Sequence, residues 1–160
     1  AWGCPRCDAT LEPPARMNAL PDTLQTGATA RRLTPALRLV DSVAELTADD
    51  VGCIAITASH GGLSAGRYAL AVRPALTVFN DAGVGLAQAG IAALPMLDEA
   101  GLAACTVAHT SACIGQAQST WATGVISHVN AKALALGLCP EQALQTQVTD
   151  WLARQVQTDT

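Results

Sequence analysis

Apolar runs recur along the chain from residue 37, and segments of helical composition separate them. The expected strands are short, apolar and uninterrupted, and they lie at 37–42, 52–59, 75–80 and 102–109. The expected helices lie at 63–72, at 86–101 with a kink or break at Pro95, at 124–137, and in a final segment opened by Pro140. This alternation predicts an α/β fold with a mostly parallel, Rossmann-like sheet of about four strands between two helical layers.

Residues 1–36 differ from the rest, because five of the chain's prolines fall there. We expect this stretch to be an extended N-terminal arm that lies on another surface, and 37–160 to be a single α/β domain. The first ten residues, AWGCPRCDAT, lack the charged and apolar regions of a signal peptide. The cysteines of the arm, Cys4 and Cys7, resemble half of a zinc ribbon in spacing. With no second pair of this kind, we expect thiols or a local disulfide and no metal.

Composition and charge exclude several classes of protein. Half of the residues are apolar and 14% are charged, which is typical of a compact core. The net charge is −4 and Lys132 is the only lysine, so no basic stripe suggests a nucleic-acid partner. No apolar run is long enough to cross a membrane. The core is rich in small side chains, so we expect a homo-oligomer. Cys53 and Cys105 lie in strand-like runs, which favours a reducing cytoplasm.

Polar residues and glycines follow three of the expected strands. These strand ends are Ser59-His60-Gly61-Gly62, Asn80-Asp81-Ala82-Gly83 and His109-Thr110-Ser111. Because parallel strands bring their carboxyl ends to the same edge of a sheet, where ligands bind in α/β proteins, these side chains should meet. The sequence therefore predicts a small-molecule site at this edge.

The candidate catalytic residues are His60, Asp81 and Ser111. His60 would move a proton, and Asp81 would orient it or act as a second base. Alternatively, His60 is a surface histidine and Asp81 belongs to a turn. Ser111 is more suited to a substrate hydrogen bond than to nucleophilic attack, because no GxSxG elbow is present. Cys113 is either an inert thiol or one activated by His109.

Further residues are candidates for binding the substrate. Gly61 and Gly62 precede an expected helix, whose N-terminus with Arg67 would hold an anion. The remaining candidates are polar or glycine residues near the same edge, namely Ser59, Asn80, Gly83, Ser127 and Asn130. His128 would be either a partly buried histidine with its hydrogen bonds satisfied inside the protein or a residue at a subunit contact. The stretch Gly83-Val84-Gly85 departs from the dinucleotide fingerprint at Gln88, so no organic cofactor is indicated.

These features predict a hydrolase or lyase that uses histidine and aspartate in acid–base chemistry. Its substrate would be a small metabolite carrying a carboxylate or another anionic group. The alternative is a non-catalytic ligand-binding or regulatory subunit of a larger assembly, which would use the same edge to sense a metabolite. A third possibility is a purely structural assembly subunit, in which this edge stays empty.

Overall fold

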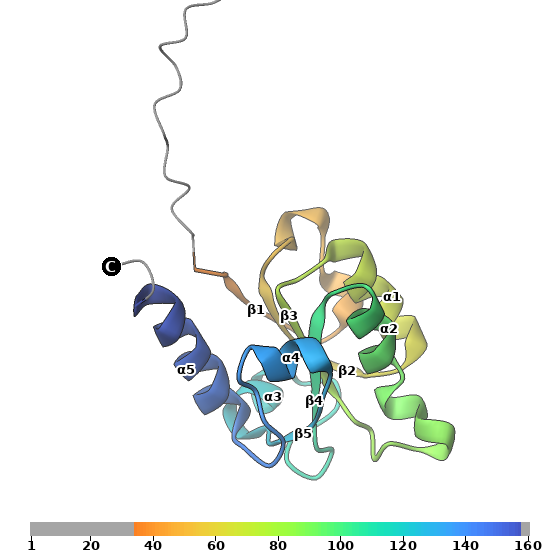
Figure 1. Cartoon of the computed structure of the whole chain (residues 1–160). Coiled ribbons are helices and arrows are strands. Elements are labelled where there is room, and N and C mark those ends of the chain that lie inside the picture. The colour runs from red at the N-terminus through yellow and green to blue at the C-terminus, as the bar shows by residue number, and fades with distance from the viewer. Residues whose placement is uncertain (1–33, 158–160) are drawn as a thin grey trace, which may run out of the picture. The chain divides into compact units, whose positions relative to one another are not determined.

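A single five-stranded sheet organises the domain, with the strands in the order β1-β2-β3-β4-β5 (Figure 1). The computed structural model describes residues 34–157. The strands are β1 (Leu37–Val40), β2 (Ile54–His60), β3 (Leu76–Asn80), β4 (Ala103–Val107) and β5 (Ile126–Val129). The first four strands run parallel, and β5 pairs antiparallel with β4. The predicted α/β fold with a mostly parallel sheet is confirmed, with five strands in place of four.

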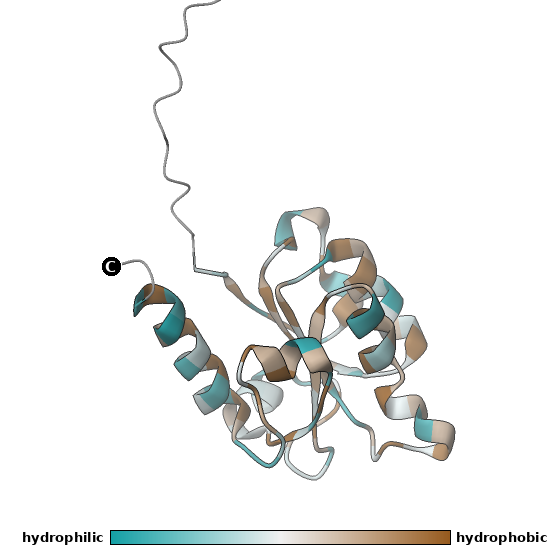
Figure 2. Ribbon diagram, viewed as in Figure 1, coloured by the Kyte–Doolittle hydropathy of each residue, from teal (hydrophilic) through white to brown (hydrophobic). Residues whose placement is uncertain are grey.

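Helices cover both faces of the sheet. The helices are α1 (Leu63–Val72), α2 (Ala93–Glu99), α3 (Ala117–Thr123), α4 (Ala131–Ala135) and α5 (Leu144–Gln157). Short 3-10 turns occupy Val43–Glu45, Ala48–Asp50 and Leu86–Ile91. Figure 1 shows α1 and α2 on one side of the sheet and α5 on the other, so the domain has three layers. Figure 2 shows hydrophilic residues along the outer side of α5.

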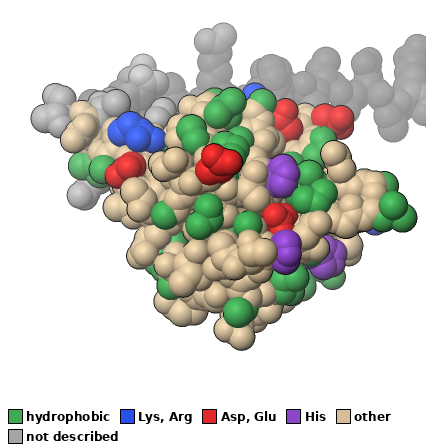
Figure 3. Space-filling view, turned by 90° about the horizontal axis from the view of Figure 1, so that it is seen from below, with side chains coloured by type: hydrophobic (Ala, Val, Ile, Leu, Met, Phe, Trp, Pro, Cys, Tyr) green, Lys and Arg blue, Asp and Glu red, His purple; other side chains and the backbone are tan. Residues whose placement is uncertain are grey.

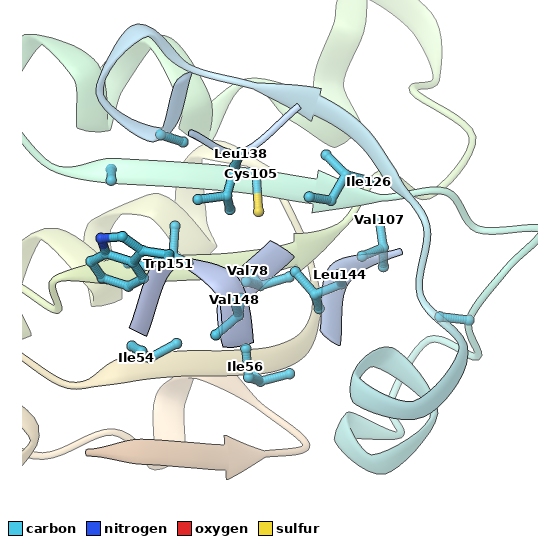
Figure 4. Packing of buried hydrophobic residues seen from close by; sticks show 14 residues of the cluster. Ile54, Ile56, Val78, Cys105, Val107, Ile126, Leu138, Leu144, Val148 and Trp151 are labelled. Atoms are coloured by element: carbon cyan, nitrogen blue, oxygen red, sulfur yellow. The ribbon is translucent and has the colours of Figure 1, made fainter. Parts of the chain in front are cut away.

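Two apolar cores lie on the two faces of the sheet, because successive strand residues point to opposite sides. On the α5 side, Ile54 and Ile56 of β2 and Val78 of β3 pack against Val148 and Trp151 (Figure 4). On the other side, the strand residues Ala55, Phe79 and Ala104 pack against α1 and α2. The buried residues of α5, Leu144, Val148 and Trp151, thus share the helix face that packs on this core.

The helix predicted at 124–137 is wrong for the first part of this segment and correct only at Ala131–Ala135. The first part of this segment is the edge strand β5, and Asn130 then caps the short helix α4 by accepting a hydrogen bond from the Ala133 amide. Ser127 and Asn130 therefore do not share a helix face. The strand pairs with β4 and extends the sheet, which stabilises it more than helix propensity favours a helix.

Two other predicted helices begin later than expected. The segment 86–91 is a 3-10 turn in which Ala87 and Gln88 have left-handed backbone angles, and α2 begins only at Ala93. Pro95 thus lies in the first turn of α2, where its missing N–H leaves no hydrogen bond unmade. Pro140 precedes a turn rather than a helix, and α5 starts at Leu144.

Within the described residues, no helix is both long and apolar enough to cross a membrane. The arm predicted for 1–36 and the pair Cys4 and Cys7 fall almost entirely outside the described residues, so these remain predictions. Because β2, β3 and β4 run parallel, their carboxyl ends lie at the same edge of the sheet, as the predicted site requires. In the register of the sheet, Asn80 lies beside both His60 of β2 and Val107 of β4.

Candidate active site

The carboxyl ends of β2, β3 and β4 lie side by side, and polar side chains gather there. The chain contains three histidines. Figure 3 views the domain from below, the side to which these strand ends point, and shows histidine side chains around an acidic one. His60 ends β2, His109 follows β4, and His128 lies on β5 opposite Thr106. The histidines therefore come from three different parts of the chain.

At this edge the Asp81 carboxylate is hydrogen-bonded to His109 and not to His60. One carboxylate oxygen, Oδ1, accepts hydrogen bonds from the backbone amides of His109 and Gly83, both at 2.9 Å. The same oxygen lies 3.2 Å from Nδ1 of the His109 ring. The Asp81 side chain is 6% exposed, whereas that of His109 is 52% exposed. His109 is thus held by a buried carboxylate while much of its ring faces solvent.

The surroundings of Asp81 favour its charged form. Burial alone would raise the pKa of this carboxyl group. Hydrogen bonds from the Gly83 and His109 amides, from the Ser127 hydroxyl and from the His109 ring outweigh that effect and lower the pKa. Asp81 is therefore ionised at neutral pH and can only accept hydrogen bonds. The proton between Asp81 and His109 must then reside on Nδ1 of the imidazole.

Ser127 links Asp81 to a second histidine. Its Oγ lies 2.9 Å from Thr106 Oγ1 and 3.2 Å from His128 Nδ1. Thr106 Oγ1 lies 3.4 Å from the same ring nitrogen. We call Asp81, His109, Ser127, Thr106 and His128 the Asp81 network. Two histidines thus have their Nδ1 atoms in one network built around a single carboxylate.

The loop after Asp81 holds the carboxylate in place through a strained backbone. Within residues 81–90 the positive φ angles are those of Ala82 at 49°, Gly83 at 73°, Val84 at 67°, Gly85 at 71°, Ala87 at 52° and Gln88 at 60°. The Ala82 amide donates to Asn80 Oδ1, and the Val84 amide donates to the Asp81 carbonyl. Such angles cost roughly 1–2 kcal/mol for a residue other than glycine, and strain of this kind gathers at functional sites.

Gly90 closes the loop against Asp81. Its amide donates to the Val84 carbonyl at 2.7 Å. A Cβ atom at Gly90 would lie 2.1 Å from the Asp81 carbonyl oxygen, which is far inside van der Waals contact. The position therefore requires glycine, and the close approach of the two backbone segments fixes where the Asp81 side chain starts.

The other predicted catalytic residues are not part of the Asp81 network. His60 is exposed, and its Nδ1 accepts a hydrogen bond from the Gly62 amide at 3.2 Å. No hydrogen bond joins His60 to Asp81 within residues 34–157. Ser111 Oγ donates to the Ala108 carbonyl at 2.7 Å and accepts from the Val125 amide at 2.9 Å. Its hydroxyl is thus occupied in fixing the loop after β4.

Several predicted binding residues are used inside the protein. The Gly61 amide donates to the Asn80 carbonyl, which leaves neither Gly61 nor Gly62 with a free amide for an anion. Ser59 Oγ accepts from the Val43 amide at 2.9 Å. Arg67 is exposed on α1, and its guanidinium group forms no hydrogen bond with a described residue.

Two predicted binding residues have fully engaged carboxamides. The buried Asn80 donates to the Ala112 carbonyl through Nδ2, and its Oδ1 holds the loop amide described above. Asn130 lies beside Ala104, near the opposite edge of the sheet. Its Oδ1 accepts from the amides of Ala104 and Ala133, and its Nδ2 donates to the carbonyls of Leu94 and Leu102. All four of its hydrogen-bonding positions are filled, which is typical of a structural residue.

Two hollows border the Asp81 network. One has a volume of about 420 Å³ and is lined by His109, Thr110, Ser111, Ala112, Cys113, Ile114, Ser119 and Thr123. The other, about 550 Å³, lies between α2 and β5 and includes His128 in its wall. Volumes of this size suit small molecules. Each histidine of the Asp81 network thus faces a hollow of its own.

Residue types that bind metals do not cluster within the described part of the chain. Sequence reasoning found Asp81 and Ser127 but did not pair Asp81 with His109, although His109 stood at the predicted edge. Thr106 lies inside an apolar strand, so the sequence did not mark it as a candidate. Its place in the network follows from the pairing of β4 with β5, which sets Thr106 opposite His128.

No protein-family model, curated protein or solved structure matches the chain.

Proposed function

We propose that the protein is an enzyme, of the hydrolase or lyase type, in which Asp81 and His109 perform acid–base chemistry on a small polar substrate. The observation that carries this proposal is the double hydrogen bond of His109, through its amide and Nδ1, to the buried Asp81 carboxylate. A histidine oriented by a carboxylate, with its other nitrogen outward, is the arrangement used for general acid–base catalysis.

The chemistry follows from the proton positions. With the proton of the neutral ring on Nδ1, the lone pair of Nε2 is available as a base, and no described residue forms a hydrogen bond with that nitrogen. Nε2 would take a proton from water or from an acidic C–H group of the substrate. The Asp81 carboxylate would stabilise the resulting imidazolium, which would then return the proton to the leaving group.

The surroundings of His109 suggest the kind of substrate. The hollow beside it offers the Thr110 and Ser119 hydroxyls and the exposed Cys113 thiol, so a small polar molecule would fit. His60, on the neighbouring strand end, would be a second proton carrier rather than the partner of Asp81.

The test is a turnover screen with purified variants. The panel would include p-nitrophenyl esters for hydrolysis and small hydroxy acids for elimination, the latter followed by ultraviolet absorbance. We expect His109→Asn to lower kcat by about 100-fold or more, since general acid–base groups typically contribute that much. Asp81→Asn should lower it by a similar factor, and the exposed Gln145→Ala on α5 should leave it unchanged.

A turnover that survives His109→Asn would contradict the proposal. Binding of a panel member at His109, seen by NMR, with no turnover of any member would favour the regulatory subunit instead. These two results are distinguishable, because the first shows chemistry elsewhere and the second shows a site without chemistry.

A further inference from the structure

The larger hollow is an elongated groove between α2 and β5. One wall is formed by Ile91, Leu94, Pro95 and Asp98, which recur at the spacing of one helix face. The opposite wall is the stretch 128–131 at the end of β5 and the start of α4. From Leu94 to Asp98 the helix rises about 6 Å, and Ile91 extends this wall into the preceding 3-10 turn.

The two ends of the groove differ in chemistry. At the sheet edge stands His128, whose Nδ1 belongs to the Asp81 network. At the far end stands Asp98, whose Oδ1 accepts the Lys132 amide at 3.0 Å. Between them the walls are mainly aliphatic, and Leu63 at the start of α1, which is 50% exposed, contributes to them. Within the part of the chain that the structure describes, no lysine or arginine side chain lines the groove.

We propose that this groove binds the aliphatic part of a small ligand that carries no anionic group there and whose polar group reaches His128. The apolar walls favour an aliphatic chain. A carboxylate in the groove would meet the Asp98 carboxylate with no cation to balance it, so charge complementarity excludes an anionic group there. As a description of the substrate, this inference rests on the proposed function, because His128 and His109 belong to the same Asp81 network.

The test uses n-butanol, n-hexanol and n-octanol as probes, titrated into the full-length protein. Binding would be followed by NMR through the ring signals of His128 and the backbone signal of Val129. Each added methylene that becomes buried should tighten binding about fourfold. Hexanoate should bind more weakly than hexanol. The inference is overturned if no alcohol shifts these signals in a saturable way, or if hexanoate binds more tightly than hexanol.

Two tryptophan variants on α4 distinguish binding in the groove from general effects of a tryptophan substitution on the protein. Ala131 is exposed and lines the groove, so Ala131→Trp should fill it and weaken n-octanol binding at least tenfold. Ala135, at the other end of the same helix, is exposed and outside the groove, so Ala135→Trp should leave binding unchanged. Equal effects of the two variants would contradict the proposal.

Ligand binding in the groove and catalysis at His109 are tested separately. His109 does not line the groove, so His109→Asn should bind n-octanol within about twofold of the natural protein. If the alcohols bind but His109→Asn does not affect turnover, the groove stands and the proposed function fails. If light scattering shows a dimer that Ala131→Trp converts to a monomer, the groove is an interface between two copies and the ligand proposal is wrong.

Discussion

Replacing Asp81 by asparagine tests how much the carboxylate stabilises the domain. Asparagine has the same shape, and its oxygen can still accept the Gly83 and His109 amides. Hydrogen bonds to a charged acceptor contribute about 1.5–3 kcal/mol, against about 0.5–1.5 kcal/mol for a neutral one. Two such bonds at 2.9 Å are weakened, so Asp81→Asn should lower the free energy of unfolding by about 2 kcal/mol at pH 7.

The pH dependence of that difference has a defined sign. The pKa of Asp81 is lowered in the folded protein, so its ionisation stabilises the fold at neutral pH. This contribution is complete above the ordinary aspartate pKa of about 4 and is lost as the pH falls through the lower, folded pKa. The difference between the natural protein and Asp81→Asn should therefore shrink from about pH 4 downward.

The assay is urea unfolding at pH 7 and at about pH 3, followed by tryptophan fluorescence, with the free energy extrapolated to water. Asp150→Asn, an exposed change on α5, is the control and should have no effect at either pH. Equal stability of Asp81→Asn and the natural protein at pH 7 would refute the reasoning. So would a difference that grows on acidification.

Three more substitutions probe the loop after Asp81 and the hydrogen bonds of Asn130, each measured by the same urea assay. Gly90→Ala should destabilise by about 3 kcal/mol, because its Cβ would meet the Asp81 carbonyl, and an unchanged stability would show that the loop yields easily. Val84→Gly should stabilise by up to about 1 kcal/mol, since it removes a β-branched side chain from a φ of 67°, and any loss would contradict the strain. Asn130→Ala should cost about 4 kcal/mol, because it removes four side-chain hydrogen bonds to backbone groups at about 1 kcal/mol each, and a cost below about 1 kcal/mol would contradict their contribution.

The parallel part of the fold could be predicted because its signals are local. Buried parallel strands read as short apolar runs, and β2, β3 and β4 are of this kind. The edge strand β5 could not be predicted in the same way. It has four residues, two of them Ser127 and His128, and the residues after it favour a helix. Its pairing with β4 depends on contacts distant in sequence.

The candidate site was predicted at the edge of the sheet where the Asp81 network lies, but with a different partner for Asp81. The rule that parallel strands end together brought His60, Asp81 and His109 to one place. Which ring reaches the carboxylate depends on the turns after each strand. The Gly62 amide engages His60, whereas the His109 amide itself bonds to Asp81 and places the ring beside it. Such backbone contacts leave no pattern in the sequence.

The most direct test of the account is the tautomer of His109, measured by long-range proton–nitrogen NMR at about pH 8, where an imidazole is ordinarily neutral. The account predicts that Nδ1 carries the proton and donates it to Asp81, with Nε2 unprotonated. A neutral His109 ring with its proton on Nε2 would contradict the hydrogen bond to Asp81 and, with it, the proposed acid–base centre.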